Sequence, residues 1–181
     1  MKKVIMSTLA ALAMVTGAAF AEDNPSKFYS QDAGQWTVEG LNDGNAPFCV
    51  ASTFYDNGTF VSLFITSDNK VHLLVHDTEW NIADPVGSFK GYTATFTFFS
   101  SNTDPDRGVA DYFLKDNQTV LFTGINSEFL KSWIKYDVLT ISMPGDITKL
   151  DVGLSGSKQV VVLLTECMIK IKDNKVSGQN L

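Results

Sequence analysis

Short runs rich in valine, threonine, phenylalanine and tyrosine follow one another from Gln35 onward, with turn residues between them roughly every eight to twelve positions. This pattern is typical of an antiparallel β-sandwich or β-barrel. In the clearest run, Tyr92–Phe98, four apolar side chains alternate with three threonines. Alternate side chains of a strand point to opposite faces, so one face of this strand is predicted to be buried and the other wet. The predicted strands are Gln35–Glu39, Phe48–Phe54, Thr59–Thr66, Lys70–His76, Tyr92–Phe99, Tyr112–Leu114, Thr119–Thr123 and Val138–Met143.

Two tight turns are predicted between neighbouring strands in the first half of the chain. Asp56-Asn57-Gly58 and Ser67-Asp68-Asn69 consist of residues that tolerate a left-handed backbone or cap a hairpin. The three strands from Phe48 to His76 are therefore predicted to form a meander.

Helical patterns occur only in the C-terminal half. Asn126–Lys135 is predicted to form a short amphipathic helix, capped by Asn126 or Ser127, with one apolar face made of Phe129, Leu130, Trp133 and Ile134. The segment 156–167 is ambiguous. Its valines favour a strand, but a serine cap and aligned apolar residues favour a helix, which is the interpretation we prefer. The expected fold is a mainly β, single-domain antiparallel sandwich or barrel with one or two short helices.

The N-terminus has the features of a secretory signal peptide: two lysines, an apolar stretch, and small residues before Glu22. Cleavage is predicted after Ala21, and the alternative is a short uncleaved membrane anchor. We expect a signal peptide at 1–21, an N-terminal extension at 22–34, a β-rich domain at 35–169 and a polar tail at 170–181. No later stretch approaches the roughly 20 apolar residues of a membrane helix, so an integral helical membrane protein is not expected.

Charge excludes two classes of partner. Without the two lysines of the signal peptide, 12 basic residues stand against 20 acidic ones, a net charge of −8. A surface of this sign repels nucleic-acid phosphates and anionic lipids, so neither is an expected partner.

Two cysteines remain in the predicted mature chain, Cys49 and Cys167. In an oxidising compartment two cysteines most often form one disulfide. The alternatives are two free buried thiols or a redox pair, although the neighbouring C-x-x-C pattern of a redox pair is absent.

Several short motifs occur in a fixed order along the chain: Trp36-Thr-Val38, Phe48-Cys-Val-Ala51, Trp80, Ile141-Ser-Met-Pro-Gly145, Leu154-Ser-Gly-Ser157 and Leu164-Thr-Glu-Cys167. Together they resemble the exported bacterial proteins named after invasion-associated locus B. The sequence departs from that pattern at Glu39, where a cysteine often follows the W-x-V element. The resemblance implies a small β-rich envelope protein without known catalytic residues, linked in some members to interaction with host cells. No active site is carried over from it.

Both histidines of the protein lie in Val71–Trp80, four residues apart at His72 and His76. In a strand, residues at this spacing share a face but stand about 13 Å apart, at roughly 3.3 Å per residue. One zinc ion needs both ring nitrogens within about 2.1 Å, so the pair cannot chelate a metal in a strand. Only a helix over Lys70–His76 would restore that site.

Other catalytic or metal-binding patterns are incomplete. Ser132-Trp-Ile-Lys135 fits S-x-x-K, but no K-T-G follows, and Gly153–Ser157 misses the last glycine of G-x-S-x-G. Asp104–Gly108 resembles the start of a calcium loop but lacks its closing glutamate, so a solvated turn is predicted. We expect no catalytic residue, no metal and no cofactor.

The expected function is therefore binding by an exported, non-enzymatic protein, periplasmic or secreted, whose partner is a protein or an envelope component. Trp80 and Trp133 each lie beside polar residues at the end of a predicted element, which makes them candidate partner contacts. The alternatives are a small outer-membrane β-barrel and a hydrolase or metal enzyme that uses His72 or His76.

Overall fold

The computed structural model describes residues 25–82, 92–143 and 149–177. Over these residues the chain forms a ten-stranded antiparallel sheet and two helices, which confirms the predicted fold class. The strands are β1 (Ser26–Ala33), β2 (Trp36–Asn42), β3 (Pro47–Phe54), β4 (Thr59–Thr66), β5 (Val71–Asp77), β6 (Tyr92–Ser100), β7 (Thr103–Leu114), β8 (Thr119–Ile125), β9 (Val138–Ser142) and β10 (Leu150–Gly153). The helices are α2 (Ser127–Lys135) and α3 (Ser157–Ser177).

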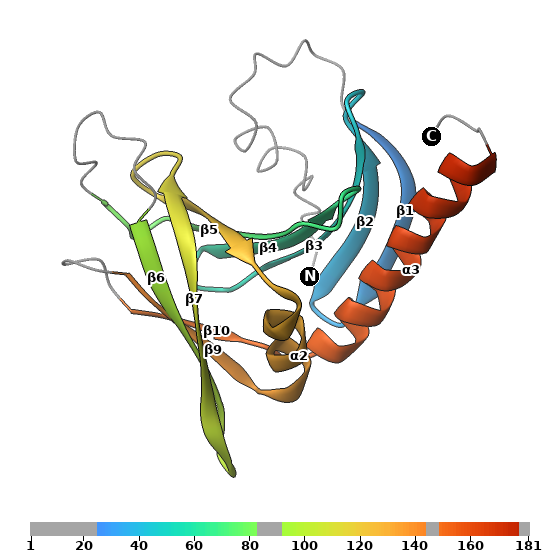
Figure 1. Cartoon of the computed structure of the whole chain (residues 1–181). Helices are drawn as coiled ribbons and strands as arrows, with labels where there is room; N and C mark the ends of the chain where they lie inside the picture. Colours follow the sequence, from blue (N-terminus) through green and yellow to red (C-terminus); the bar gives the residue numbers. More distant parts are fainter. Residues whose placement is uncertain (1–24, 83–91, 144–148, 178–181) are drawn as a thin grey trace.

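The sheet has the strand order β1-β2-β3-β4-β5-β8-β7-β6-β9-β10 (Figure 1). The first five strands form a meander, and β3–β5 are the three strands for which the two turns predicted it. Gly58 and Asn69 adopt positive φ angles of 86° and 64° in these turns, and their N–H groups donate to the carbonyls of Tyr55 and Thr66. These are residue types that tolerate a left-handed backbone at a tight turn.

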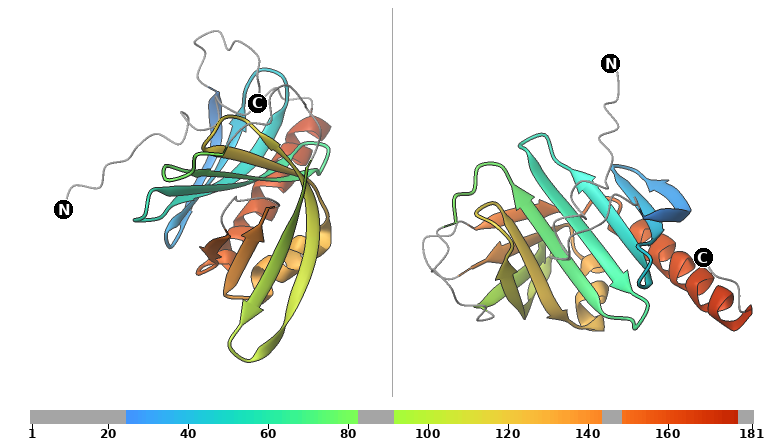
Figure 2. Two further views of the ribbon diagram at one scale, coloured as in Figure 1. Left: turned by 90° about the vertical axis from the view of Figure 1, so that its left-hand side faces the viewer. Right: turned by 90° about the horizontal axis from the view of Figure 1, so that it is seen from above.

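Strong curvature gives the sheet an inner face, against which both helices pack (Figures 1 and 2). α3 lies across β1, β2 and β3, and it also contacts α2. The main hydrophobic core fills this inner face. Among its fully buried members are Trp36, Leu63, Leu73, Phe122, Trp133, Leu139 and Leu164.

A second, smaller cluster lies on the opposite face of the same strands. It contains Leu41, Val50, Phe60, Phe64 and Leu74, all buried. These residues alternate along β2–β5 with members of the main core, so this part of the sheet is buried on both faces. This explains why β4 reads as a nearly continuous apolar run rather than as a simple alternation.

The two ends of the sheet are tied together through the segment that leads into α3. The indole Nε1 of Trp36, at the start of β2, donates to the carbonyl of Ser155 over 3.1 Å. The hydroxyl of Tyr55 donates to the carbonyl of Gly153 over 2.7 Å, and burial raises the pKa of that hydroxyl to about 12. Trp36 also packs edge-on against Trp133 of α2, with ring centroids 5.8 Å apart.

α2 begins where the sequence places it. The side chain of Asn126 accepts hydrogen bonds from the N–H groups of Glu128 and Phe129, so Asn126 is the N-cap. The buried face is centred on Phe129, Ser132 and Trp133. One residue of the predicted apolar face is wrong, because Ile134 is exposed to solvent.

The C-terminal segment is helical, as preferred for 156–167, but the helix is longer than expected. α3 continues to Ser177, and Ile171 is buried against the core. The predicted polar tail from residue 170 therefore belongs in part to a packed helix.

Two other boundaries differ from the prediction. The expected N-terminal extension contains β1, an edge strand whose side chains are mostly exposed and which therefore shows little apolar alternation. The four-residue strand β10 at the other edge was also not predicted. The predicted signal peptide lies outside the described residues.

Candidate functional site

His72 and His76 lie on β5, which confirms the predicted strand. Residues four positions apart in a strand are too far from each other to bind one metal ion. His76 Nδ1 lies 2.9 Å from the hydroxyl of Thr119, and that hydroxyl donates to Asp116 over 3.0 Å. Because the hydroxyl proton is used toward Asp116, Nδ1 of His76 is the donor to Thr119. This chain of hydrogen bonds ties β5 to the start of β8.

His72 is held differently, on the same face of β5. Its ring stacks on that of Phe64 with centroids 5.0 Å apart, and burial lowers the pKa of the imidazole. Among the described residues, no group of three or more histidine, cysteine, aspartate or glutamate side chains is arranged to hold a metal ion.

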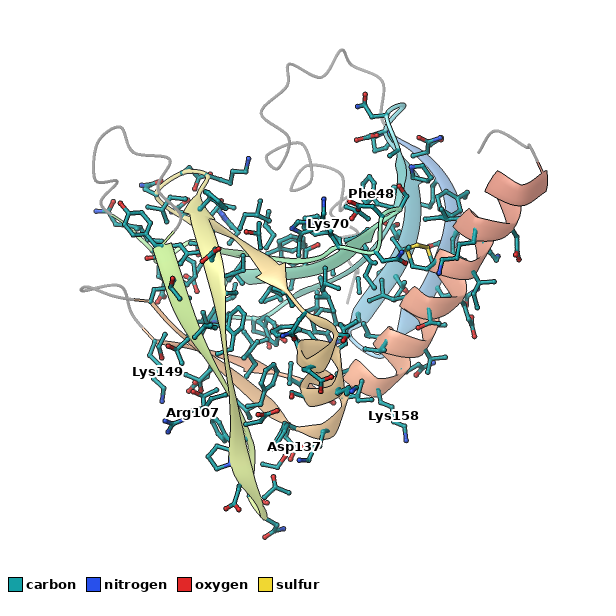
Figure 3. All side chains as sticks on the ribbon, viewed as in Figure 1. Phe48, Lys70, Arg107, Asp137, Lys149 and Lys158 are labelled. Carbon is teal, nitrogen blue, oxygen red and sulfur yellow. A yellow bond between two sulfur atoms is a disulfide. The ribbon has the colours of Figure 1, made fainter. Side chains whose placement is uncertain are left out.

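The predicted disulfide joins Cys49 of β3 to Cys167 of α3 (Figure 3). Both cysteines are fully buried, and 118 positions of sequence separate them. The bridge fastens α3 to the inner face of the sheet.

The two candidate contact tryptophans are core residues. Trp133 is 0% exposed and Trp80 is 7% exposed. Trp133 packs against Trp36 and Phe129. The hypothesis that these indoles contact a partner therefore has no exposed surface to support it.

Ser132, the serine of the S-x-x-K pattern, has no lysine partner. Lys135 donates instead to the hydroxyl of Tyr136 over 3.0 Å, while the Ser132 hydroxyl donates to the carboxylate of Asp106. Asp106 belongs to β7, so the segment expected to form a solvated turn is a strand. The hairpin turn lies at residues 101–102 instead.

A pocket of about 280 Å³ lies between β6, β7 and α2. Its apolar wall consists of Phe96, Phe98 and Phe129, with ring centroids of Phe129 5.2 Å from both of the others. Asp106, Asn126, Glu128 and Ser132 surround this wall with polar groups. Aromatic surface with a few convergent polar groups is typical of a binding site, and the volume is close to the lower end for such sites.

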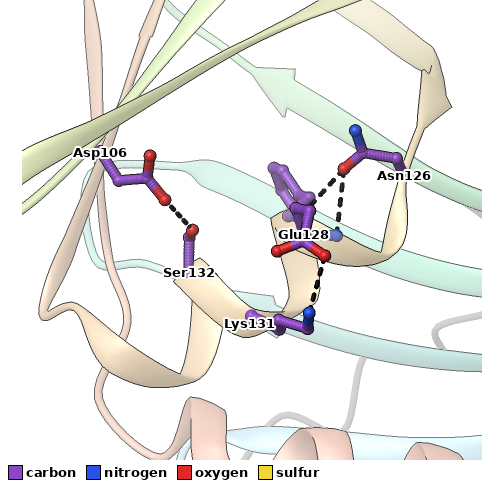
Figure 4. Close-up of polar contacts among 6 residues, drawn as sticks. Asp106, Asn126, Glu128, Lys131 and Ser132 are labelled. Atoms are coloured by element: carbon purple, nitrogen blue, oxygen red, sulfur yellow. Dashed lines mark hydrogen bonds and ion pairs between the residues drawn. The ribbon is translucent and has the colours of Figure 1, made fainter.

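The polar groups around the pocket are held in place by bonds to one another (Figure 4). Asp106 and Ser132 link β7 to the middle of α2. Asn126 caps α2, and the carboxylate of Glu128 pairs with Lys131 at 2.7 Å. These contacts fix the helix beside the strand and so fix the width of the pocket.

Part of the open space at the pocket lies above Gly108, which has no side chain. Gly108 lies opposite Phe96 in the β6–β7 ladder, between Asp106 and Ala110 on the inner face of β7. A Cβ placed on Gly108 would meet no atom within 4 Å. A glycine inside a strand weakens it and often marks a place where a ligand or another backbone comes close.

A second glycine lies where β8 leaves β7. Gly124 has a φ of 69°, and β8 pairs with β7 only as far as Thr123. Beyond this point the chain turns away from β7 into α2, so Ile125 and Asn126 form the far wall.

Sequence reasoning missed this pocket because Asp104–Gly108 was interpreted as a turn. The available signal was the length of the alternating run Tyr92–Phe98, which needs a partner strand of comparable length. β7 supplies it, pairing with β6 from Tyr112 back to Thr103.

None of the helices in the described part of the chain combines the length and hydropathy needed to cross a membrane.

Comparison with known proteins finds no relative. No family model, no curated protein and no solved structure matches the chain.

Proposed function

We propose that the protein is exported and acts by binding a partner at the pocket beside Gly108, without catalysing a reaction. The observation that carries this proposal is the pocket itself, in which the space above a glycine of a β-strand is open beside the buried rings of Phe96, Phe98 and Phe129. A valine or threonine at this position would favour the strand more than glycine does, so the open space has a cost in stability.

The residues that resembled catalytic groups have hydrogen-bond partners on neighbouring elements. Ser132 donates to a carboxylate on the neighbouring strand, and His76 donates to a threonine that is itself bonded to an aspartate. Each of these groups connects secondary-structure elements.

Export is supported by the signal-peptide pattern over residues 1–21 and by the disulfide, which is typical of oxidising compartments. The resemblance to the invasion-associated locus B proteins favours a partner in the envelope or on a host cell. N-terminal sequencing of the exported protein is expected to begin at Glu22. Protein recovered with an intact residue 1 would contradict processing after Ala21.

Site-specific photocrosslinking tests where the partner binds. Val109 is 68% exposed and adjoins the pocket, whereas Val162 is 51% exposed on α3. A photoreactive residue at position 109 is expected to capture a discrete partner from envelope or host-cell extract, and one at position 162 is not. Adding Gly108→Leu, which fills the pocket, should abolish that adduct. Equal capture at both positions, or capture that survives Gly108→Leu, would contradict the proposal.

A further inference from the structure

β7 has one edge that is only partly paired. On one side, β6 pairs with it along most of its length, from Thr103 to Tyr112. On the other side, β8 pairs only with Asp111–Leu114 before turning away at Gly124. Among the described strands, therefore, none continues the ladder beside residues 103–110 on that side.

The main-chain N–H and C=O groups of every second residue of β7 face this edge. The N–H of Lys115 donates to the carbonyl of Thr119 over 2.9 Å, which places Lys115 in a hydrogen-bonded pair on the β8 side. Main-chain groups alternate in direction along a strand, so those of Arg107 and Val109 also face the side that β8 leaves. The next position in this series is Pro105, which has no N–H to leave unpaired. The free part of the edge is thus centred on Arg107 and Val109.

The pocket lies on the inner side of this same edge. A strand added antiparallel to β7, in line with β8, would place one residue opposite Gly108. Its side chain would point to the inner face, toward Phe96 and the uncovered space at Gly108. The volume of about 280 Å³ is sufficient for one apolar side chain.

The charges around the pocket favour some side chains of an added strand over others. Three charged residues line the pocket: Asp106 and Arg107 on β7 and Glu128 on α2. The carboxylate of Glu128 is paired with Lys131, so Asp106 is the lining carboxylate without an ion-pair partner among the described residues. Arg107 lies opposite Thr97 on the other face, and Figure 3 shows it directed away from α2. The chain as a whole carries a net charge of −6. A partner with basic side chains next to its apolar one would complement this surface.

We propose that the ligand is an extended basic segment of a partner protein, which pairs with the free edge of β7 and seats one apolar side chain over Gly108. This inference rests on the proposed function and specifies its ligand. Recognition follows the mode in which an added strand gains main-chain hydrogen bonds while a pocket selects every second side chain.

Selection from a library of random heptapeptides tests this inference on the exported, disulfide-bonded protein. Binders are retained on the wild type and removed on Gly108→Leu, whose thermal unfolding shows that it is folded. We expect enrichment of sequences with an apolar residue flanked, two positions away, by lysine or arginine. No enrichment, or enrichment of acidic sequences, would overturn the inference.

N-methylation of a selected peptide tests the strand pairing directly. The residues on either side of the apolar anchor should donate to the edge of β7, whereas the N–H of the anchor points away from it. Methylating the two flanking amides is expected to weaken binding by about tenfold or more, and methylating the anchor amide should change it little. Equal effects would overturn the pairing with β7.

The two proposals fail in different ways. If position 109 captures a partner that Gly108→Leu abolishes, but no peptide is selected, the pocket binds another chemistry and only the peptide inference falls. If neither experiment depends on Gly108, the proposed function falls as well.

Discussion

Gly108 and Phe96 lie directly opposite each other in the β6–β7 ladder, where the ring of Phe96 is buried and the space that a side chain at position 108 would occupy is open. The residue at position 108 thus affects both the stability of the strand and the open space of the pocket. The same position therefore connects stability with the proposed binding.

Gly108→Val is expected to stabilise the protein by about 0.5–1 kcal/mol, because a β-branched residue favours the strand and its Cβ meets no atom. Urea unfolding measures this change. Gly40→Ala is the matched comparison in β2, where a Cβ would lie 2.5 Å from Cε2 of Phe28 and 2.9 Å from Cβ of Tyr29. That crowding is expected to cost about 1–3 kcal/mol. A loss of stability in Gly108→Val would contradict the uncovered position.

Removal of the disulfide should be strongly destabilising. The Cys49–Cys167 bridge spans 118 positions. Closing a loop of that length lowers the conformational entropy of the unfolded chain and so raises its free energy by about 4–5 kcal/mol. The variant with both cysteines replaced by serine is expected to lose about this much unfolding free energy and to become insensitive to reducing agent. Wild-type protein under native conditions should show no thiol to an alkylating reagent. Two alkylated cysteines would contradict the bridge.

The sequence alone predicts the strands in which apolar residues alternate with polar ones, and those that are bounded by typical turn residues. β4 has the predicted bounds, and the meander from β3 to β5 follows from its Gly58 and Asn69 turns. In these segments local preference and tertiary burial agree. The bridge between Cys49 and Cys167 was predictable because the sequence contains only these two cysteines, which allow one pairing.

The two long strands that were missed or shortened, β1 and β7, have side chains largely exposed to solvent. The third, β10, has only four residues, two of them buried. The residues of β7 from Thr103 to Val109 are all exposed, so no apolar alternation marks them. They form a strand because β6 supplies a partner for their backbone. The pocket could not be predicted for the same reason, since it depends on which residue of β7 faces Phe96 and on how close α2 lies.

Trp36→Phe tests how the two ends of the sheet are held together. The substitution keeps most of the packing on Trp133 but removes the Nε1 donor, leaving the Ser155 carbonyl without this bond. We expect a loss of about 1–3 kcal/mol in unfolding free energy. Thr37→Val, on the next residue, removes an exposed hydrogen bond to Asp32 and should change stability by less than about 0.5 kcal/mol. Equal effects of the two substitutions would show that the Trp36 bond does not connect these segments.

Acid sensitivity should depend on His72. Burial is the main cause that lowers the pKa of this imidazole below its ordinary value of 6.5, with a smaller raising effect from Asp68 and a lowering one from Lys70. The unfolded chain therefore takes up this proton at a higher pH than the folded protein does. The stability contribution of His72 is complete above about pH 6.5 and decreases as the pH falls through that value toward the lowered pKa of the folded state.

His72→Phe removes this titration while keeping an aromatic ring against Phe64. The unfolding free energy of the variant is expected to fall less steeply between about pH 7 and pH 5 than that of the wild type. Urea unfolding at a series of pH values measures the two slopes. Proton NMR of the wild type should show a lower titration midpoint for the His72 ring in the folded protein than in urea. Parallel slopes and equal midpoints would mean that the stacked ring is as accessible to protons in the folded protein as in the unfolded chain.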